Sequence, residues 1–174
     1  EQAHFWLGTR AYARNHPNRF ALKVLRTILG GGMSSRLFLS VRERQGLCYY
    51  ISANYDDYAD TGSFAAYAGV DLQRVNQALR ATEKEFELIR STKVSDAELH
   101  KAKSYLKGKL VMNLEDSENV ANMIAHQQLF YDRFFSLEEQ KELIDSLTAE
   151  QVQAVAQELL DPKNLVLTII GPFT

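Results

Sequence analysis

The stretch from residue 29 to residue 50 constrains the fold of this chain more than any other part of the sequence. It contains three consecutive glycines, which end an apolar helical pattern and free the backbone for positive φ angles: Gly30, Gly31 and Gly32. The two serines that follow Met33 can cap a second, short helix, which Gly46 ends, and β-forming residues begin a strand directly afterwards. Arg42 therefore lies near the end of a helix and Tyr49 at the start of a strand, with a tight turn between them. A fixed cation and a phenol at such a junction can both reach one oxygen atom beyond the sheet edge.

Apolar patterns along the rest of the chain predict strands and helices in a definite order. Alternating or continuous apolar residues indicate strands over residues 4–13, 47–58, 63–70 and 165–170. The short link between the middle two makes them an antiparallel hairpin, and the nearly unbroken apolar run of the last is expected at a central position of the sheet. Helical spacing fills the long intervals, in several places after a capping-box signal. The sequence therefore predicts an α+β fold, with a mostly antiparallel sheet of about four strands and helices packed on one face.

Length and composition fit one domain spanning residues 1–174, which is enough chain to bury a full core. Since 20 basic residues balance 22 acidic ones, for a net charge of −2, nothing indicates a nucleic-acid or membrane partner. The single cysteine, Cys48, has no histidine nearby in the sequence and is expected to be a small buried residue. The aromatic-rich segment 130–135 favours core packing, with an interdomain contact surface as the alternative. A basic run is expected on the solvated face of one helix: Lys101, Lys103, Lys107 and Lys109.

The histidines do not form a metal-binding pattern. A helix that binds catalytic zinc through His-x-x-Glu-His presents two histidines four residues apart with a glutamate between them. No such pair occurs among the four histidines of this chain: His4, His16, His100 and His126. We therefore expect no metal site in this chain alone.

Two runs of residues carry a family resemblance: Leu-Gly-Gly-Gly-Met-Ser-Ser-Arg-Leu-Phe at 29–38 and Val-Arg-Glu-Arg-Gln-Gly-Leu-Cys-Tyr at 41–49. Together they resemble the C-terminal domain of the pitrilysin/insulinase family of zinc metallopeptidases, which includes mitochondrial processing peptidase. A first strand like residues 3–8 and a closing strand like residues 165–171 extend the resemblance over nearly the whole chain. It implies a half-clamshell domain without zinc. Its partner would be an N-terminal, zinc-binding half, on the same polypeptide or on a separate subunit in a dimer-like assembly.

The resemblance also implies roles for particular residues. In that family, an arginine and a tyrosine seven residues later reach from the C-terminal half to the zinc site, and Arg42 and Tyr49 match both positions, whereas Arg44 does not. Both would donate hydrogen bonds to the scissile carbonyl, where negative charge develops during amide cleavage. The loop that matches residues 30–32 borders the peptide cleft in processing-peptidase relatives, which implies a substrate-binding role for the glycines. The residues themselves leave structural alternatives open: an ion pair for Arg42, a half-buried strand aromatic for Tyr49, and a plain helix C-cap for the glycines.

The implied function is that of the zinc-free half of a zinc metalloendopeptidase. This half would close the cleft, bind an extended peptide and stabilise the scissile carbonyl, and it would be inactive alone. The chain itself would hold no cofactor, and zinc would be bound by the missing half. The alternative is a non-catalytic scaffold or peptide-binding subunit of the same fold. A His-x-x-Glu-His motif upstream of residue 1 or in an adjacent reading frame would favour the peptidase.

Overall fold

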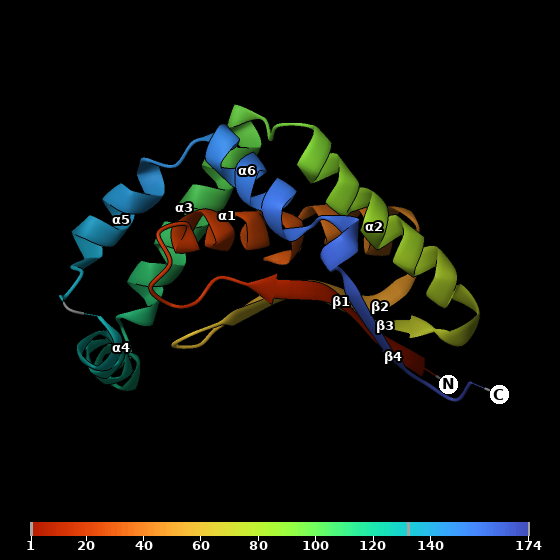
Figure 1. Cartoon of the computed structure of the whole chain (residues 1–174), viewed down its shortest axis with the longest axis horizontal. Helices are drawn as coiled ribbons and strands as arrows, with labels where there is room; N and C mark the ends of the chain where they lie inside the picture. The colour runs from red at the N-terminus through yellow and green to blue at the C-terminus, as the bar shows by residue number, and fades with distance from the viewer. Residues whose placement is uncertain (1, 132, 174) are drawn as a thin grey trace.

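The structure, a computed structural model, describes residues 2–131 and 133–173. It has two layers, a four-stranded antiparallel sheet and a layer of helices that covers one face of it (Figure 1). The predicted α+β class is therefore confirmed. In chain order the elements are β1 (Gln2–Ala11), α1 (Arg19–Gly30), the π-helical turn η1 (Phe38–Arg44), β2 (Cys48–Asp57), β3 (Gly62–Asp71), the 3-10 turn η2 (Leu72–Arg74), α2 (Val75–Ser91), α3 (Asp96–Asn113), α4 (Ser117–Phe130), α5 (Leu137–Asp145), α6 (Ala149–Leu159), the 3-10 turn η3 (Pro162–Asn164) and β4 (Val166–Ile170).

The sheet has the strand order β2-β3-β1-β4, so β1 and β4 pair although they come from opposite ends of the chain. The hairpin of β2 and β3 is present as predicted. The central position expected for residues 165–170 is wrong, because among the described strands β4 pairs only with β1 and therefore forms an edge of the sheet. Its side chains are largely exposed, with Ile170 at 72% and Val166 at 66%. An apolar run indicates a strand, but it does not determine how many neighbours that strand has.

The core lies between the sheet and the helices. Alternation along β1 buries Ala3, Phe5 and Leu7 against the helical layer, and leaves Trp6 on the opposite face at 47% exposure. α1 is buried on most of its surface because it packs against β2, α3 and α6. The largest fully buried side chains come from β1, β3, α1, α2 and neighbouring segments: Phe5, Phe64, Phe86, Leu22, Leu25, Leu29, Leu37 and Ile89. None of the described helices has the length and apolar character needed to cross a membrane.

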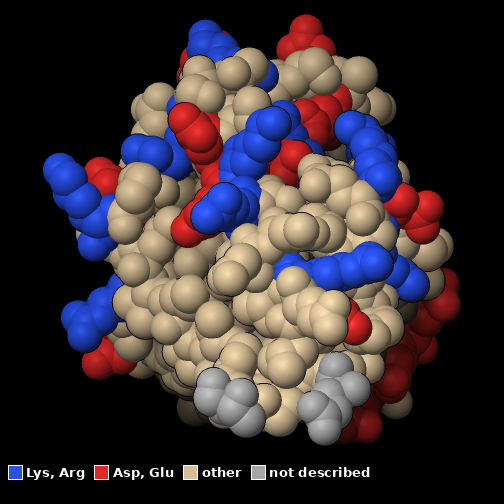
Figure 2. All heavy atoms as spheres, turned by 90° about the vertical axis from the view of Figure 1, so that its right-hand side faces the viewer, with Lys and Arg blue, Asp and Glu red and all other residues tan. Residues whose placement is uncertain are grey.

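The helices leave the other face of the sheet uncovered (Figure 1). Aromatic side chains lie on this bare face, where Trp6 stacks on Tyr67 with 4.9 Å between ring centroids. The Nδ1 atom of His4 lies 2.9 Å from the Tyr50 hydroxyl at the end of the same cluster. Figure 2 views the domain from the right-hand side of Figure 1 and shows that charged side chains gather in the upper part of this end and are sparse in the middle of its lower part.

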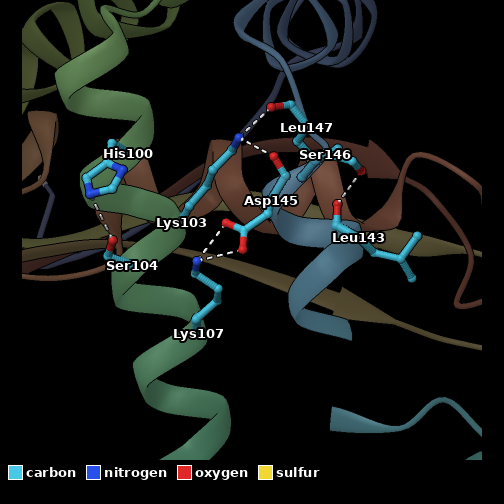
Figure 3. Close-up of polar contacts among 8 residues, drawn as sticks. All are labelled: His100, Lys103, Ser104, Lys107, Leu143, Asp145, Ser146 and Leu147. Atoms are coloured by element: carbon cyan, nitrogen blue, oxygen red, sulfur yellow. Dashed lines mark hydrogen bonds and ion pairs between the residues drawn. The ribbon is translucent and has the colours of Figure 1, made fainter. Parts of the chain in front are cut away.

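Two lysines of the basic run on α3, Lys103 and Lys107, contact the end of α5 (Figure 3). The Lys103 ammonium donates to the carbonyl oxygens of Asp145 and Leu147, at 2.9 and 2.6 Å. The Lys107 ammonium pairs with the Asp145 carboxylate at 2.6 Å. Cations at the last carbonyls of a helix are favourable because those groups carry partial negative charge. The expectation that the whole run is simply solvated is therefore wrong for Lys103 and Lys107.

Candidate functional site

The first of the three glycines is needed for packing. A Cβ atom on Gly30 would lie 2.1 Å from the backbone nitrogen of Ala53 and 2.6 Å from its Cβ, so α1 approaches β2 too closely for any side chain there. The Ser52 hydroxyl donates to the Gly30 carbonyl at 2.7 Å and ties the helix end to the strand. Gly31 has φ −78° and ψ −10°, and among the described glycines only Gly46 has positive φ. The prediction of positive φ at the glycine run is therefore wrong, because close contact rather than a left-handed turn requires glycine at the first position.

The glycine loop borders a cavity of 260 Å³ between the end of α1 and α3. Two side chains of α3 fasten the loop, since Tyr105 donates its hydroxyl proton to the Gly31 carbonyl at 2.9 Å and Lys101 donates to the Ser34 carbonyl at 2.9 Å. Gly32 is exposed at the rim, where the nearest atom to an added Cβ would be the Tyr105 hydroxyl oxygen at 3.8 Å. The sequence did not reveal that Tyr105 and Lys101 contact this loop, because nothing in the local spacing of α3 shows that it packs against a loop 67 to 74 residues earlier.

Arg42 lies on the π-helical turn η1. Such turns widen the backbone and occur often at functional sites. The Arg42 side chain is exposed, and its guanidinium carbon lies 4.7 Å from the centre of the Phe38 ring. Over residues 2–131 and 133–173, Arg42 has no carboxylate within ion-pair distance. The predicted alternative of an ion pair to a neighbouring residue thus has no support within the described part of the chain.

Tyr49 is the extra residue of a β-bulge. Cys48 pairs with Val70 and Tyr50 pairs with Gly69, which leaves Tyr49 without a partner on β3. Bulges re-aim side chains and are frequent next to active sites. Tyr49 is 52% exposed, which is compatible with the alternative of a half-buried strand aromatic, and its hydroxyl has no hydrogen-bond partner among the described residues.

The turn between the two irregular segments holds their backbones together. The Leu47 amide donates to the Val41 carbonyl and the Gly46 amide to the Arg42 carbonyl, both at 3.0 Å. The Arg42 charge also acts on the neighbouring Cys48 thiol, whose pKa it lowers slightly against the larger effect of burial. Neither Arg42 nor Tyr49 lines the cavity beside the glycines. The predicted site residues therefore form two groups, Arg42 with Tyr49 at one junction and the glycine loop at another.

Cys48 should react slowly with alkylating reagents. Burial raises the pKa of its thiol to about 11, so the thiol is protonated at neutral pH and the reactive thiolate is scarce. The rate of modification by iodoacetamide should rise with pH until about pH 11, well above the pKa of about 8.5 typical of a free cysteine. Mass spectrometry of the intact chain at a series of pH values measures this rate. A midpoint near that of free cysteine would contradict the effect of burial.

The histidines lie in ordinary surroundings. The His16 ring stacks on Tyr12 with 3.8 Å between centroids, and His100 lies next to Ser104 on α3. Within the described residues, no three His, Cys, Asp or Glu side chains come together as a group that could hold a metal ion. The residues described here therefore do not fit a zinc ion.

Comparison with known proteins identifies the domain. The family described as the peptidase M16 inactive domain matches residues 1–106. An uncharacterised zinc protease of Mycobacterium bovis is 38% identical over 172 residues, which cover 99% of this chain and 39% of that protein. The beta subunit of the mitochondrial-processing peptidase of Rattus norvegicus is 29% identical over 178 residues, which cover 98% of this chain and 36% of that subunit.

Solved structures show the same fold. The crystal structure of a peptidase M16 inactive domain from Pseudomonas fluorescens matches with a TM-score of 0.89 at 24% identity, over 99% of this chain and 42% of that one. The chain thus spans well under half the length of these relatives. The resemblance carried by residues 29–49 is confirmed, and the chain belongs to the peptidase M16 family of zinc metallopeptidases as its inactive domain.

Proposed function

We propose that this chain is the zinc-free half of a zinc metalloendopeptidase, which closes the cleft over an extended peptide and places Arg42 and Tyr49 on the scissile carbonyl. The zinc ion would be held by a separate N-terminal half, on the same polypeptide or on another subunit, and would activate the attacking water there. The relatives named as zinc proteases and as a processing-peptidase subunit support this assignment.

One observation carries the catalytic part of the proposal. The two candidate side chains are exposed, come from two adjacent backbone irregularities, and have no competing ionic or hydrogen-bond partner among the described residues. Arginine remains charged at any working pH, and a phenol donates a hydrogen bond without becoming charged. Donors held in this way are suited to an oxygen on which negative charge grows, as it does when an amide carbonyl is attacked.

The uncovered sheet face suits the cleft-closing part of the proposal. It carries stacked aromatic side chains, and a domain of this kind would present it toward the partner half. The glycine loop, with its exposed Gly32 at the rim of a cavity, is the proposed place of contact with substrate backbone.

The test is to assay peptide hydrolysis by this chain alone and by the chain joined to, or mixed with, its natural N-terminal half loaded with zinc. The isolated chain should hydrolyse nothing and the assembly should be active. In the assembly, Tyr49→Phe should lower kcat by about 100-fold, because the ring remains and only the donor is lost. Tyr58→Phe, at another exposed tyrosine, serves as the control. Unchanged turnover in Tyr49→Phe would contradict the catalytic role of Tyr49.

The second candidate function is a non-catalytic scaffold or peptide-binding subunit. It would be favoured if the remaining polypeptide and its neighbouring reading frame lack His-x-x-Glu-His, and if the assembly binds peptides without cleaving them. Fold alone does not separate the two, since one fold supports several functions.

A further inference from the structure

A second cavity, of 160 Å³, lies away from both groups of candidate residues. It is bounded by the first half of α1, the last turns of α4 and the segment that leads to α5, on the side of the domain drawn at the left of Figure 1. The side chains that matter for its chemistry are Arg19, Phe20, Lys23, Gln127, Tyr131 and Phe135. Nothing in the proposed peptidase role uses this cavity.

The cavity carries an excess of positive charge. Arg14, beside it, is paired with Asp57 at 2.8 Å, so that carboxylate is already engaged. In the described part of the chain, neither Arg19 nor Lys23 has a carboxylate within 4.0 Å. Arg19 instead packs on aromatic faces, with its guanidinium carbon 5.0 Å from the Phe135 ring centre and 5.2 Å from that of Tyr131.

Lys23 is a half-buried ammonium in an unfavourable environment. Burial lowers its pKa, the Asp57 carboxylate only partly offsets this, and the charges of Arg19 and Arg14 lower the pKa further. Its nearest aromatic contact is the Phe20 ring, with 5.5 Å from the ammonium nitrogen to the centroid. An anion bound beside Lys23 would compensate this charge.

Gln127 provides a donor that the fold leaves unused. The side chain is 6% exposed and lines the cavity. Its Oε1 atom accepts a hydrogen bond from the Phe135 amide at 2.6 Å, which fixes the orientation of the amide group. Its Nε2 atom is buried and has no acceptor among the described residues. Buried donors are rarely left without a partner, so an unpaired one at a cationic cavity is available to a bound ligand or water molecule.

We propose that this cavity binds a small monocarboxylate. The carboxylate would accept hydrogen bonds from the Lys23 ammonium and the Gln127 amide, with the Arg19 charge close by, and its apolar part would lie against Tyr131 and Phe135. A phosphate dianion is a poorer match, because much of the wall is aromatic and phosphate has no apolar part to place against it. The restricted volume limits the ligand to something near the size of acetate or benzoate.

The site can be tested by binding to the chain itself. Sodium acetate, sodium benzoate and sodium phosphate are titrated against sodium chloride at equal ionic strength, with thermal unfolding and calorimetry as readouts. Benzoate and acetate should raise the unfolding temperature saturably and phosphate should not, since binding to the folded state alone is stabilising. Lys23→Met should weaken binding by about tenfold, because it removes one charged hydrogen bond. Lys84→Met, at an exposed lysine of α2, is the matched control and should bind as the wild type does.

A second variant keeps the test decisive if Lys23→Met folds poorly. Gln127→Glu retains the oxygen that accepts from the Phe135 amide but replaces the unused donor with negative charge. This variant should fold and lose carboxylate binding. Equal binding by Gln127→Glu and the wild type, or no saturable effect of any carboxylate on the wild type, would overturn the proposal. Asp132 lies outside the described residues, so Asp132→Asn is included as a further variant. If Asp132→Asn binds carboxylates and the wild type does not, the proposal is overturned, because the carboxylate at the site would then come from the chain itself.

Discussion

Replacing Arg42 by alanine should lower kcat of the assembled peptidase by about 100- to 1000-fold while KM changes little. The Arg42 side chain is exposed and packs on Phe38 of its own turn, so its removal should leave the fold and the binding of substrate backbone nearly intact. The loss should appear in kcat because, in the proposed role, the guanidinium acts on charge that develops only as the carbonyl is attacked. Steady-state hydrolysis of a fluorogenic peptide by the zinc-loaded assembly measures both constants.

Arg44 provides the matched control for Arg42. It lies on the same π-helical turn, two residues further on, and its side chain is also exposed. Arg44→Ala removes the same charge from the same turn, so a general electrostatic effect on substrate would appear in both variants. Equal kcat values for Arg42→Ala and the wild type, or equal losses in Arg42→Ala and Arg44→Ala, would contradict a specific role for Arg42. Arg42→Lys should recover only part of the activity, because lysine keeps the charge without the planar fork of donors.

Gly30→Ala should destabilise the domain by about 3 kcal/mol, the upper part of the range for overpacked cores. The added methyl group would lie 2.1 Å from the Ala53 nitrogen, and its nearest neighbours are backbone atoms of β2 and the Ala53 Cβ atom, with no flexible side-chain end that could move aside. For a chain of this length the unfolding temperature should fall by about 6 to 12 °C. Thermal and urea unfolding followed by circular dichroism measure the change.

Gly32 is the matched control for Gly30. An added Cβ there would have no atom nearer than 3.8 Å, and its φ is not positive. Gly32→Ala should therefore leave stability unchanged or slightly raise it, by restricting the unfolded chain. Equal destabilisation by the two substitutions would show that the loop is sensitive to any side chain, and that close packing against β2 is not the reason for glycine at position 30.

Local signals in the sequence were enough for the strands, several helix starts and the family. Alternation along β1 separates the buried Phe5 from the exposed Trp6, and two of the helices that follow a capping-box signal, α5 and α6, have that box, at Ser136 and Thr148. These features depend on residues within a few positions of one another, so the sequence displays them directly. The motif around Arg42 was also sufficient to identify the family.

Features that depend on contacts between distant residues were predicted wrongly or not at all. The glycine run ends α1 as expected, but the positive φ predicted there is wrong, and the reason for Gly30 is the closeness of Ala53, which no local pattern reports. The bulge that exposes Tyr49 depends on its register with β3, which a strand pattern does not determine. The core packing expected for the aromatic segment 130–135 is wrong, because none of its aromatic side chains belongs to the buried core. Phe134 is 54% exposed, and Tyr131 and Phe135 pack around Arg19 instead.

The sequence by itself determined the α+β class, the hairpin, the absence of the His-x-x-Glu-His pattern from this chain and the candidate pair Arg42 and Tyr49. Only the tertiary structure decided that β4 is an edge strand, that α3 fastens the glycine loop, and that a cationic cavity forms beside Lys23 and Gln127. The physical reason is the range of the interactions involved. Helix capping and strand alternation act between near neighbours, whereas strand order, close approach and cavity formation depend on which distant surfaces pack together.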